Sequence, residues 1–349
     1  MKKIIFLIII FLFINTLSWA STHKNVVGEV LEVVKAKDSY NQEILKVKIL
    51  EGKERGQVIK INRQIIEYSF HDFNLSEGDN ILIELYTDEN NSLSGRFINI
   101  WRIEKLKTLS LIFIISIILF GGLKGILSIS SLLFSAYIIV KFMIPGILKG
   151  YNIILVSILS ALLIVTISFI LIAGFTKKSY VSILGTIGGT ITAGLIAYSY
   201  SKLMKVTGMA DENVVFLIRN IGLDLDYGNL YISSILLGTI GAVMDVSMSI
   251  TTSMFEIKKQ SPRIGTLALI QSGFHIGKDV MSTMVNTLIL AYSGSSMLLI
   301  IVYFLSDIPY IHALNTEILI SEIIRSLCSS IGLVITIPLT VFIAAYSLK

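Results

Sequence analysis

The chain divides into two parts by the spacing of its apolar residues. Up to about residue 106, short apolar runs alternate with polar positions and are separated by Gly, Asn and Asp. From Lys107 onward the apolar residues form long runs, near the ~20 residues that a helix needs to cross a bilayer. About seven transmembrane helices are predicted, at 108–123, 125–143, 152–173, 181–200, 229–254, 281–305 and 328–347.

The part at 21–106 has the pattern of a small β-domain. Alternating apolar and polar residues bounded by turn residues indicate strands. They fall at 26–34, 43–50, 56–61, 80–86 and 95–103. Short strands in this number predict a small barrel or sandwich, OB-like in type. The segment lacks the aromatic and basic platform with which such barrels bind nucleic acid, so a docking or gating module is favoured.

The first residues resemble an export signal. Lys2 and Lys3 precede an apolar stretch, and Ser18-Trp19-Ala20 provides the small residues of a cleavage site. A signal peptide at 1–20 is therefore expected, with an uncleaved signal anchor as the alternative. In either case 21–106 is predicted to be extracytoplasmic.

Composition and charge agree with a bilayer location. Of the 349 residues 54% are hydrophobic and only 15% are charged, whereas soluble domains have about 25% charged residues. The formal net charge of +5 does not indicate nucleic acid, because the basic residues flank apolar segments. With the N-terminal domain outside, the inner ends carry Lys124, Lys177, Lys178, Lys258, Lys259, Arg263, Lys278 and Lys349; the outer ends carry Lys141, Lys149, Lys202, Lys205, Arg219 and Arg325. This asymmetry predicts a cytoplasmic C-terminus in a bacterial cytoplasmic membrane.

A single acid interrupts the fifth predicted helix. Asp245 is the only formally charged residue between Tyr231 and Phe255. Steps of three and four residues place it on a small, polar face, whereas the opposite side is apolar. That face is predicted to contain Ser234, Gly238, Gly241, Ala242, Ser249, Thr252 and Glu256. The acid is therefore expected to point toward protein or water and not toward lipid.

Two further helices have small, polar faces. The sixth predicted helix contributes Asp279, Ser282, Thr283, Asn286, Ser293 and Gly294; the fourth contributes Gly185, Gly188, Gly189, Thr192 and Ser199. Such stripes allow close packing around a shared polar line. Tight packing alone is the alternative for the glycines Gly185, Gly189, Gly238 and Gly241, and bonds to the backbone of the same helix are the alternative for Ser and Thr.

The carboxylate has a stronger functional interpretation than its neighbours. Burying it costs about 2.5–3.5 kcal/mol even on a lenient insertion scale. The third to seventh predicted helices contain no Lys or Arg to pair with it. It must be protonated, hydrated, hydrogen-bonded to amides and hydroxyls, or bound to a cation. Each state suits a proton or cation site, with Asn286 and Thr283 as neutral co-ligands.

Three stretches in order resemble a known family. GAVMDVSMSI (241–250) with Glu256, HIGKDVMSTMVNTLILAYSGSS (275–296) and NTEILISEIIRSLCSSIGLVITIPLT (315–340) are similar to the YibE/F family of bacterial multi-pass membrane proteins. The resemblance covers roughly residues 107–347, after an exported β-domain. It implies this architecture and supplies no substrate.

Enzyme motifs are not found. The sequence has no HExxH, no Walker A loop and no GxSxG elbow, so no catalytic residues and no cofactor are expected. His275 and Asp279 share a helix face, but two groups do not make a metal site. The lone Cys328 excludes an internal disulfide. Glu322 and Arg325, spaced i, i+3, are predicted to pair just outside the last helix.

These features favour a permease whose path lies between the fourth, fifth and sixth predicted helices. Its expected residues are Asp245, Asn286, Thr283, Ser249, Thr252, Asp279, Glu256 and Thr192. The main alternative is a non-transporting accessory protein that docks an extracytoplasmic partner, or a second copy, through its β-domain. A membrane-embedded enzyme is the third interpretation. The expected partners are the lipid bilayer and protons or cations, and no nucleic acid.

Overall fold

The computed structural model describes residues 25–35, 42–64, 74–87, 93–210 and 212–349. The chain forms two compact units, Met1–Phe120 and Gly121–Lys349, which are described separately. The predicted signal at 1–20 lies outside the described residues.

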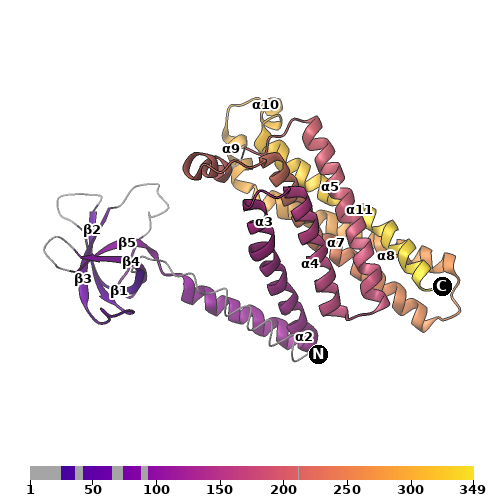
Figure 1. The fold of residues 1–349 in the computed structure, drawn as a ribbon, viewed down its shortest axis with the longest axis horizontal. Coiled ribbons are helices and arrows are strands. Elements are labelled where there is room, and N and C mark those ends of the chain that lie inside the picture. Colours follow the sequence, from indigo (N-terminus) through magenta and orange to yellow (C-terminus); the bar gives the residue numbers. More distant parts are fainter. Residues whose placement is uncertain (1–24, 36–41, 65–73, 88–92, 211) are drawn as a thin grey trace. The chain divides into compact units, whose positions relative to one another are not determined.

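The first unit contains a five-stranded antiparallel sheet (Figure 1). Its strands are β1 (Asn25–Lys35), β2 (Gln42–Ile49), β3 (Val58–Gln64), β4 (Asn80–Thr87) and β5 (Leu93–Ile100). The spatial order is β3-β2-β1-β4-β5. β2 and β3 alternate strictly between exposed and buried residues, so the inward positions form the core. The predicted alternation is therefore realised in each of these strands.

The sheet curls until its two edges nearly meet. β3 and β5 lie in contact although no ladder joins them. Gly95 on β5 makes the approach possible, because a Cβ there would lie 2.7 Å from Cδ1 of Ile59. Fully buried aliphatic residues such as Leu45, Ile61 and Ile83 fill the interior. The prediction of a small, OB-like β-barrel is confirmed by this nearly closed sheet.

One ion pair lies inside this β-domain, and its disruption should be costly. Arg63 donates to Glu43 at 3.0 Å, and the two side chains are 2% and 5% exposed. We expect Arg63→Ala to destabilise the domain by about 3–5 kcal/mol, because the Glu43 charge loses its partner inside the protein. The denaturant midpoint, followed by Trp101 fluorescence in a Trp19→Phe background, measures this loss.

The matched control is the exposed pair of Lys46 and Glu32, which are 3.7 Å apart with both side chains about half exposed. Lys46→Ala should change stability by less than about 1 kcal/mol. Equal effects of Arg63→Ala and Lys46→Ala would contradict the role of the buried pair.

The rest of the chain is helical. Its long elements are α2 (Ile103–Ile138), α4 (Ile153–Ala173), α5 (Lys177–Leu203), α7 (Tyr227–Gln260), α8 (Thr266–Ser295) and α11 (Glu317–Ser347). The short ones are the π-helical η1 (Ile139–Met143) and η2 (Leu217–Ile221), with α3 (Ile144–Leu148), α6 (Glu212–Phe216), α9 (Met297–Leu305) and α10 (Tyr310–Leu314).

Five helices of the described residues are long and apolar enough to cross a membrane, or six if α8 and α9 form one bent span. The first of them, Ile103–Leu148, has 46 residues, more than twice the length that one crossing needs. Gly122 interrupts it with non-helical angles (φ 53°, ψ −131°). The predicted helices 108–123 and 125–143 are the parts before and after this kink, and only by counting them separately does the total reach the expected seven.

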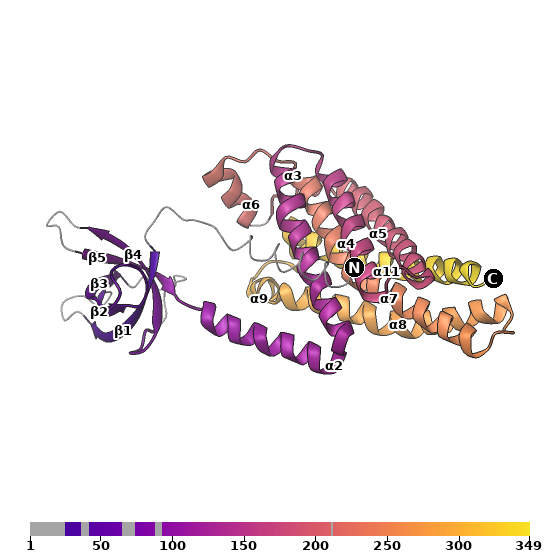
Figure 2. The same ribbon diagram turned by 60° about the horizontal axis from the view of Figure 1, so that its bottom comes forward.

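The second unit is a bundle built on α5, α7 and α11 (Figure 2). These three helices make the most extensive contacts with one another. α4 packs against α5 and α7, and α8 packs against α7 and α11. Figure 1 places α9 and α10 at the end of the bundle opposite the C-terminus.

Two helix boundaries differ from the prediction. The span expected at 281–305 begins at Thr266 and breaks after Ser295, where α9 turns away by 64°. Glu322 and Arg325, expected just outside the span at 328–347, lie within the first part of α11, which begins at Glu317. In both cases the helix continues through residues of mixed polarity, because contacts with neighbouring helices stabilise it there. Average hydropathy does not record such contacts.

Candidate functional site

Asp245 lies near the middle of α7, a helix of 34 residues. The helix begins cleanly because the carboxylate of Asp226 accepts a hydrogen bond from the Asn229 backbone at 2.9 Å. Val243, Val246 and Ile250 are fully buried on its inner side. Asp245 is exposed on the opposite side. The packing of the apolar stripe therefore fixes the direction of the acid.

The whole polar face predicted for α7 is exposed in the second unit, apart from half-buried Ala242. Its exposed members are Ser234, Gly238, Gly241, Asp245, Ser249, Thr252 and Glu256. Within the described part of the chain, the carboxylate of Asp245 has no hydrogen-bond or ion-pair partner. Bilayer lipid cannot solvate this carboxylate, so the face needs water, a cation or another polar surface.

α8 carries a second exposed polar stripe. Asp279, Ser282, Thr283 and Asn286 are all exposed on it. The hydroxyl of Ser282 donates to the Asp279 carbonyl at 2.8 Å, and that of Thr283 donates to the Val280 carbonyl at 3.0 Å. Asn286 has no such local partner among the described residues. Its amide is therefore free to bind a ligand. The sequence predicted that Asp279 lies at the beginning of its helix. In the structure it lies near the middle of α8, because the helix begins at Thr266.

Small and apolar residues contribute to the contact between α7 and α8. The two helices are neighbours, and small residues on the inner side of α8 make close contacts. A Cβ on Gly273 would lie 2.7 Å from the sulfur of Met254 on α7, whereas one on Gly277 would lie 2.3 Å from Cγ2 of Ile337 on α11. Asp245 and Asn286 are both exposed, and no hydrogen bond joins them among the described residues, so their approach across this interface stays a prediction. Apolar packing occupies the inner sides of both helices.

The small face of α5 points to α11 and not to α8. A Cβ on Gly185 would lie 2.6 Å from Oγ of Ser247 and would also meet the Thr340 hydroxyl. A Cβ on Gly189 would lie 2.9 Å from the Gly332 carbonyl oxygen. Thr192 is half-buried and donates to the Gly188 carbonyl at 2.8 Å. α5 therefore contributes packing, and the structure does not bring Thr192 to Asp245.

The glycines of α7 differ from those of α5. No atom lies within 4 Å of a Cβ built on Gly241. At Gly238 only the Tyr292 hydroxyl is close, at 2.9 Å. Gly241 thus leaves room beside Asp245 on the exposed face.

A buried set of hydroxyls was missed in the sequence. Ser247 donates to the Ser182 carbonyl at 3.0 Å, and Thr340 donates to the Ser247 hydroxyl at 3.2 Å. Nearby, the hydroxyls of Thr239 and Ser329 are 2.9 Å apart. These bonds join α5, α7 and α11 in the middle of the bundle. No sequence pattern distinguishes these hydroxyls from Ser and Thr that bond only to their own helix.

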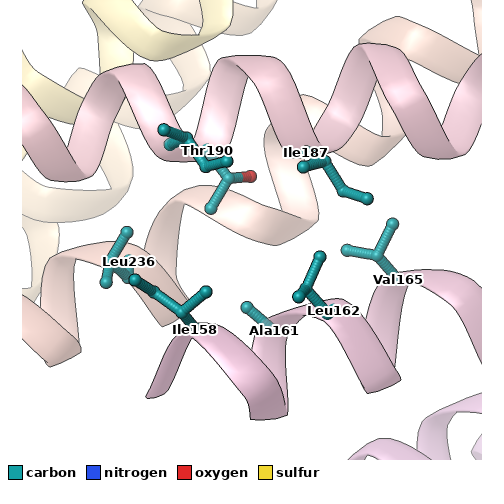
Figure 3. A pocket seen from close by; sticks show the side chains of 8 residues that line it. Ile158, Ala161, Leu162, Val165, Ile187, Thr190 and Leu236 are labelled. Carbon is teal, nitrogen blue, oxygen red and sulfur yellow. The ribbon is translucent and has the colours of Figure 1, made fainter. Parts of the chain in front are cut away.

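A small crevice between α4 and α5 is lined by apolar residues (Figure 3). Its volume is about 20 Å³, and Leu236 of α7 closes one end. The hydroxyl of Thr190 is buried, and it finds no partner in the described residues. One water molecule would fit by volume, but it would need two or more polar partners. The crevice is therefore a packing defect and not a binding site.

No metal site forms among the described residues, where no three of His, Cys, Asp and Glu come together. His275 and Asp279 are both exposed on α8. Cys328 is buried and unbridged.

The fold is that of a polytopic α-helical membrane protein with an N-terminal β-barrel domain. Residues 109–349 match the family model described as YibE/F-like protein, and residues 21–100 match the YibE/F family N-terminal domain. The chain belongs to the YibE/F family, as its three stretches of resemblance predicted. No curated protein and no solved structure matches it.

Proposed function

We propose that this protein is a permease driven by a proton or cation gradient and that Asp245 is the group that binds the driving ion. One observation carries the proposal: a carboxylate without a partner in the described chain lies in the middle of a membrane-length helix. An ionisable residue at such a depth is expensive to keep and is typically functional.

The chemistry around Asp245 suits a proton or a cation. The two outward stripes supply Ser249 and Thr252 from α7 and Thr283 and Asn286 from α8, all with oxygen donors. Hard cations bind carboxylate, hydroxyl and amide oxygens. Asp279 and Glu256 extend the acidic character along the same stripes. The proposed path follows these stripes, and Asp245 is the ion-binding residue in its middle.

The proposal is tested by flux measurements. Uptake profiling of a deletion strain across ions, metals and amphiphiles identifies a substrate. Sealed vesicles with and without the protein are then given a pH or cation gradient. The proposal requires that the gradient drive substrate movement only when the protein is present. Substrate movement that ignores every imposed gradient would contradict it.

A second function is favoured by a feature of the β-barrel. Val34 and Ile44 pair across β1 and β2 and are 46% and 37% exposed. An exposed pair of aliphatic residues suits protein docking, so an accessory role remains the second candidate. Val34→Asp together with Ile44→Lys distinguishes the two functions, because it should abolish partner capture and leave transport unchanged.

The proposed orientation places the β-domain outside and the C-terminus in the cytoplasm. It rests on the asymmetry of the basic residues, among them Lys177, Lys178 and Lys258 at inner ends. A periplasm-active reporter inserted at Ser94 and a cytoplasm-active reporter after Lys349 should both be active. The exchanged reporters provide the control and should both be inactive. If the reporters placed Ser94 and Lys349 on the same side of the membrane, an odd number of spans between them would be contradicted.

A further inference from the structure

The connection between α5 and α7 contains a helix that lies outside the bundle. α6 and η2 follow each other without a break over residues 212–221. Among the described residues, these two elements make their main contacts with each other. Figure 2 shows α6 projecting beside the bundle, clear of its long helices. This connecting helix (212–221) is therefore largely uncovered by the part of the protein that the structure describes.

The connecting helix has an exposed apolar side. Ile218 and Ile221 are three residues apart, which places them on the same side, and they are 38% and 56% exposed. Arg219 and Asn220 lie between them in sequence and point to the opposite side. Phe216 adds exposed aromatic surface just before them. A short helix with one apolar and one polar side is typical of segments that lie in the membrane–water interface.

Both ends of the connection are fixed to the bundle. The carboxylate of Glu317, the first residue of α11, accepts hydrogen bonds from the Thr207 and Gly208 backbones at 2.7 and 2.9 Å. Gly208 also lies against the start of α7, where a Cβ would be 2.3 Å from the Tyr227 carbonyl oxygen. On the far side, the Tyr227 hydroxyl donates to the Leu223 carbonyl at 2.7 Å. The connecting helix is therefore held at the level where α5 ends and α7 and α11 begin.

This level coincides with the membrane–water interface. α5 is long and apolar enough to cross a membrane, and Tyr198 and Lys202 lie one turn apart near its end. The Lys202 ammonium donates to the Tyr198 hydroxyl and lies 4.3 Å from the centroid of its ring. Tyrosine rings and the charged tips of lysines favour the level of the lipid headgroups. The connecting helix follows a few residues later, beside the same headgroups.

The charge of the connection indicates what kind of contact it makes. Between residues 209 and 226 the only basic residue is Arg219, and the acids are Asp211, Glu212, Asp224 and Asp226. Helices that attach to anionic membranes by charge are rich in Lys and Arg instead. Attraction to anionic lipids therefore does not hold this segment, and its contact with lipid depends on apolar side chains.

We propose that the connecting helix is an interfacial anchor, which inserts Ile218 and Ile221 among the acyl chains of the lipid leaflet around this end of the bundle. Arg219 and Asn220 then face the headgroups and water. Such helices bury their apolar side about 5–10 Å deep, near the boundary between headgroups and acyl chains. In the proposed orientation this is the outer leaflet. The anchor does not depend on Asp245, so it stands or falls separately from the permease function.

The test places a single tryptophan on either side of the helix in the full protein, in phosphatidylcholine nanodiscs. The background is Trp19→Phe with Trp101→Phe, which removes both native tryptophans. Ile218→Trp should lose fluorescence when the lipid is brominated near the carbonyl end of its acyl chains, and aqueous iodide should quench it little. Asn220→Trp is the matched control and should show the reverse. Both positions are exposed, so neither variant requires the interior to rearrange.

Three outcomes would overturn the proposal. If iodide alone quenched Ile218→Trp, the apolar side would lie in water. If neither quencher reached it, a second copy or another segment of the chain would cover it. Stronger quenching by lipid brominated near the methyl end would place the helix in the membrane core and not at the interface.

A change of lipid tests the apolar character of the contact. Replacing part of the phosphatidylcholine by phosphatidylglycerol adds negative charge to the membrane surface. Quenching of Ile218→Trp by the brominated lipid should stay the same, because the acids outnumber the single Arg219 in this connection. Quenching that rises with the phosphatidylglycerol content would show that charge holds the helix, and the apolar anchor would be wrong.

Discussion

Replacing Asp245 by asparagine is expected to leave the protein inserted and folded but to abolish gradient-driven transport. Asparagine has nearly the size of aspartic acid and retains hydrogen-bonding capacity, but it cannot release a proton or neutralise a cation. The fold should tolerate the change because Asp245 is exposed and has no partner among the described residues. Removing a formal charge from the centre of a span even lowers the cost of insertion. Transport should fall to the level of vesicles without the protein.

Two variants and one abundance measurement make this result decisive. Asp245→Glu keeps a titrating carboxylate and should retain part of the activity, since Gly241 leaves room for an extra methylene. Asp307→Asn removes an acid from the loop after α9 and should have no effect. Membrane abundance is measured for each variant. Full transport by Asp245→Asn at normal abundance would mean that the carboxylate does not bind the driving ion.

Much of the fold could be predicted because its elements depend on local periodicity. The strict alternation of β2 and β3 is present in the sequence and in the barrel interior. Hydropathy also locates the long helices, because bilayer thickness imposes a minimum length on them. The kink at Gly122 falls at the predicted boundary between 108–123 and 125–143, where two glycines and Lys124 interrupt the apolar run. The break at Ser296 lies inside the predicted helix 281–305 and was not predicted.

The candidate site could be predicted only in part. The helix wheel identified the face of α7 correctly as one surface, because exposure follows the 3.6-residue period. It could not tell which neighbouring helix the small residues of α5 would contact, and they meet α11. The pairing of Glu322 with Arg325 could be predicted, because the i, i+3 spacing lies within one helix, and the two groups are 3.0 Å apart.

The contact between α5 and α11 leads to the second large effect. We expect Gly189→Ala to reduce the folded population strongly, although alanine is about 1 kcal/mol better than glycine in a helix. The added Cβ would lie 3.0 Å from Cβ of Thr336 and would also overlap the Thr336 hydroxyl. The helix backbones are equally close on the other side, where a Cβ on Gly332 would lie 2.6 Å from Cβ of Ala193. The two helices must therefore separate, at a cost of about 1–3 kcal/mol or more.

Gly241→Ala is the matched control for this prediction. It adds the same methyl group to another glycine in a membrane-length helix, and no atom lies within 4 Å of the new Cβ. Helix propensity alone then applies, and stability should rise slightly or stay the same. Thermal unfolding of both purified variants in lipid nanodiscs measures the difference, and size-exclusion profiles report the folded fraction. If Gly189→Ala and Gly241→Ala unfolded at the same temperature, close α5–α11 packing would not limit stability. If only Gly241→Ala were destabilised, the exposed face of α7 would have to be covered by another protein surface in the membrane, and that surface would lie directly beside Asp245.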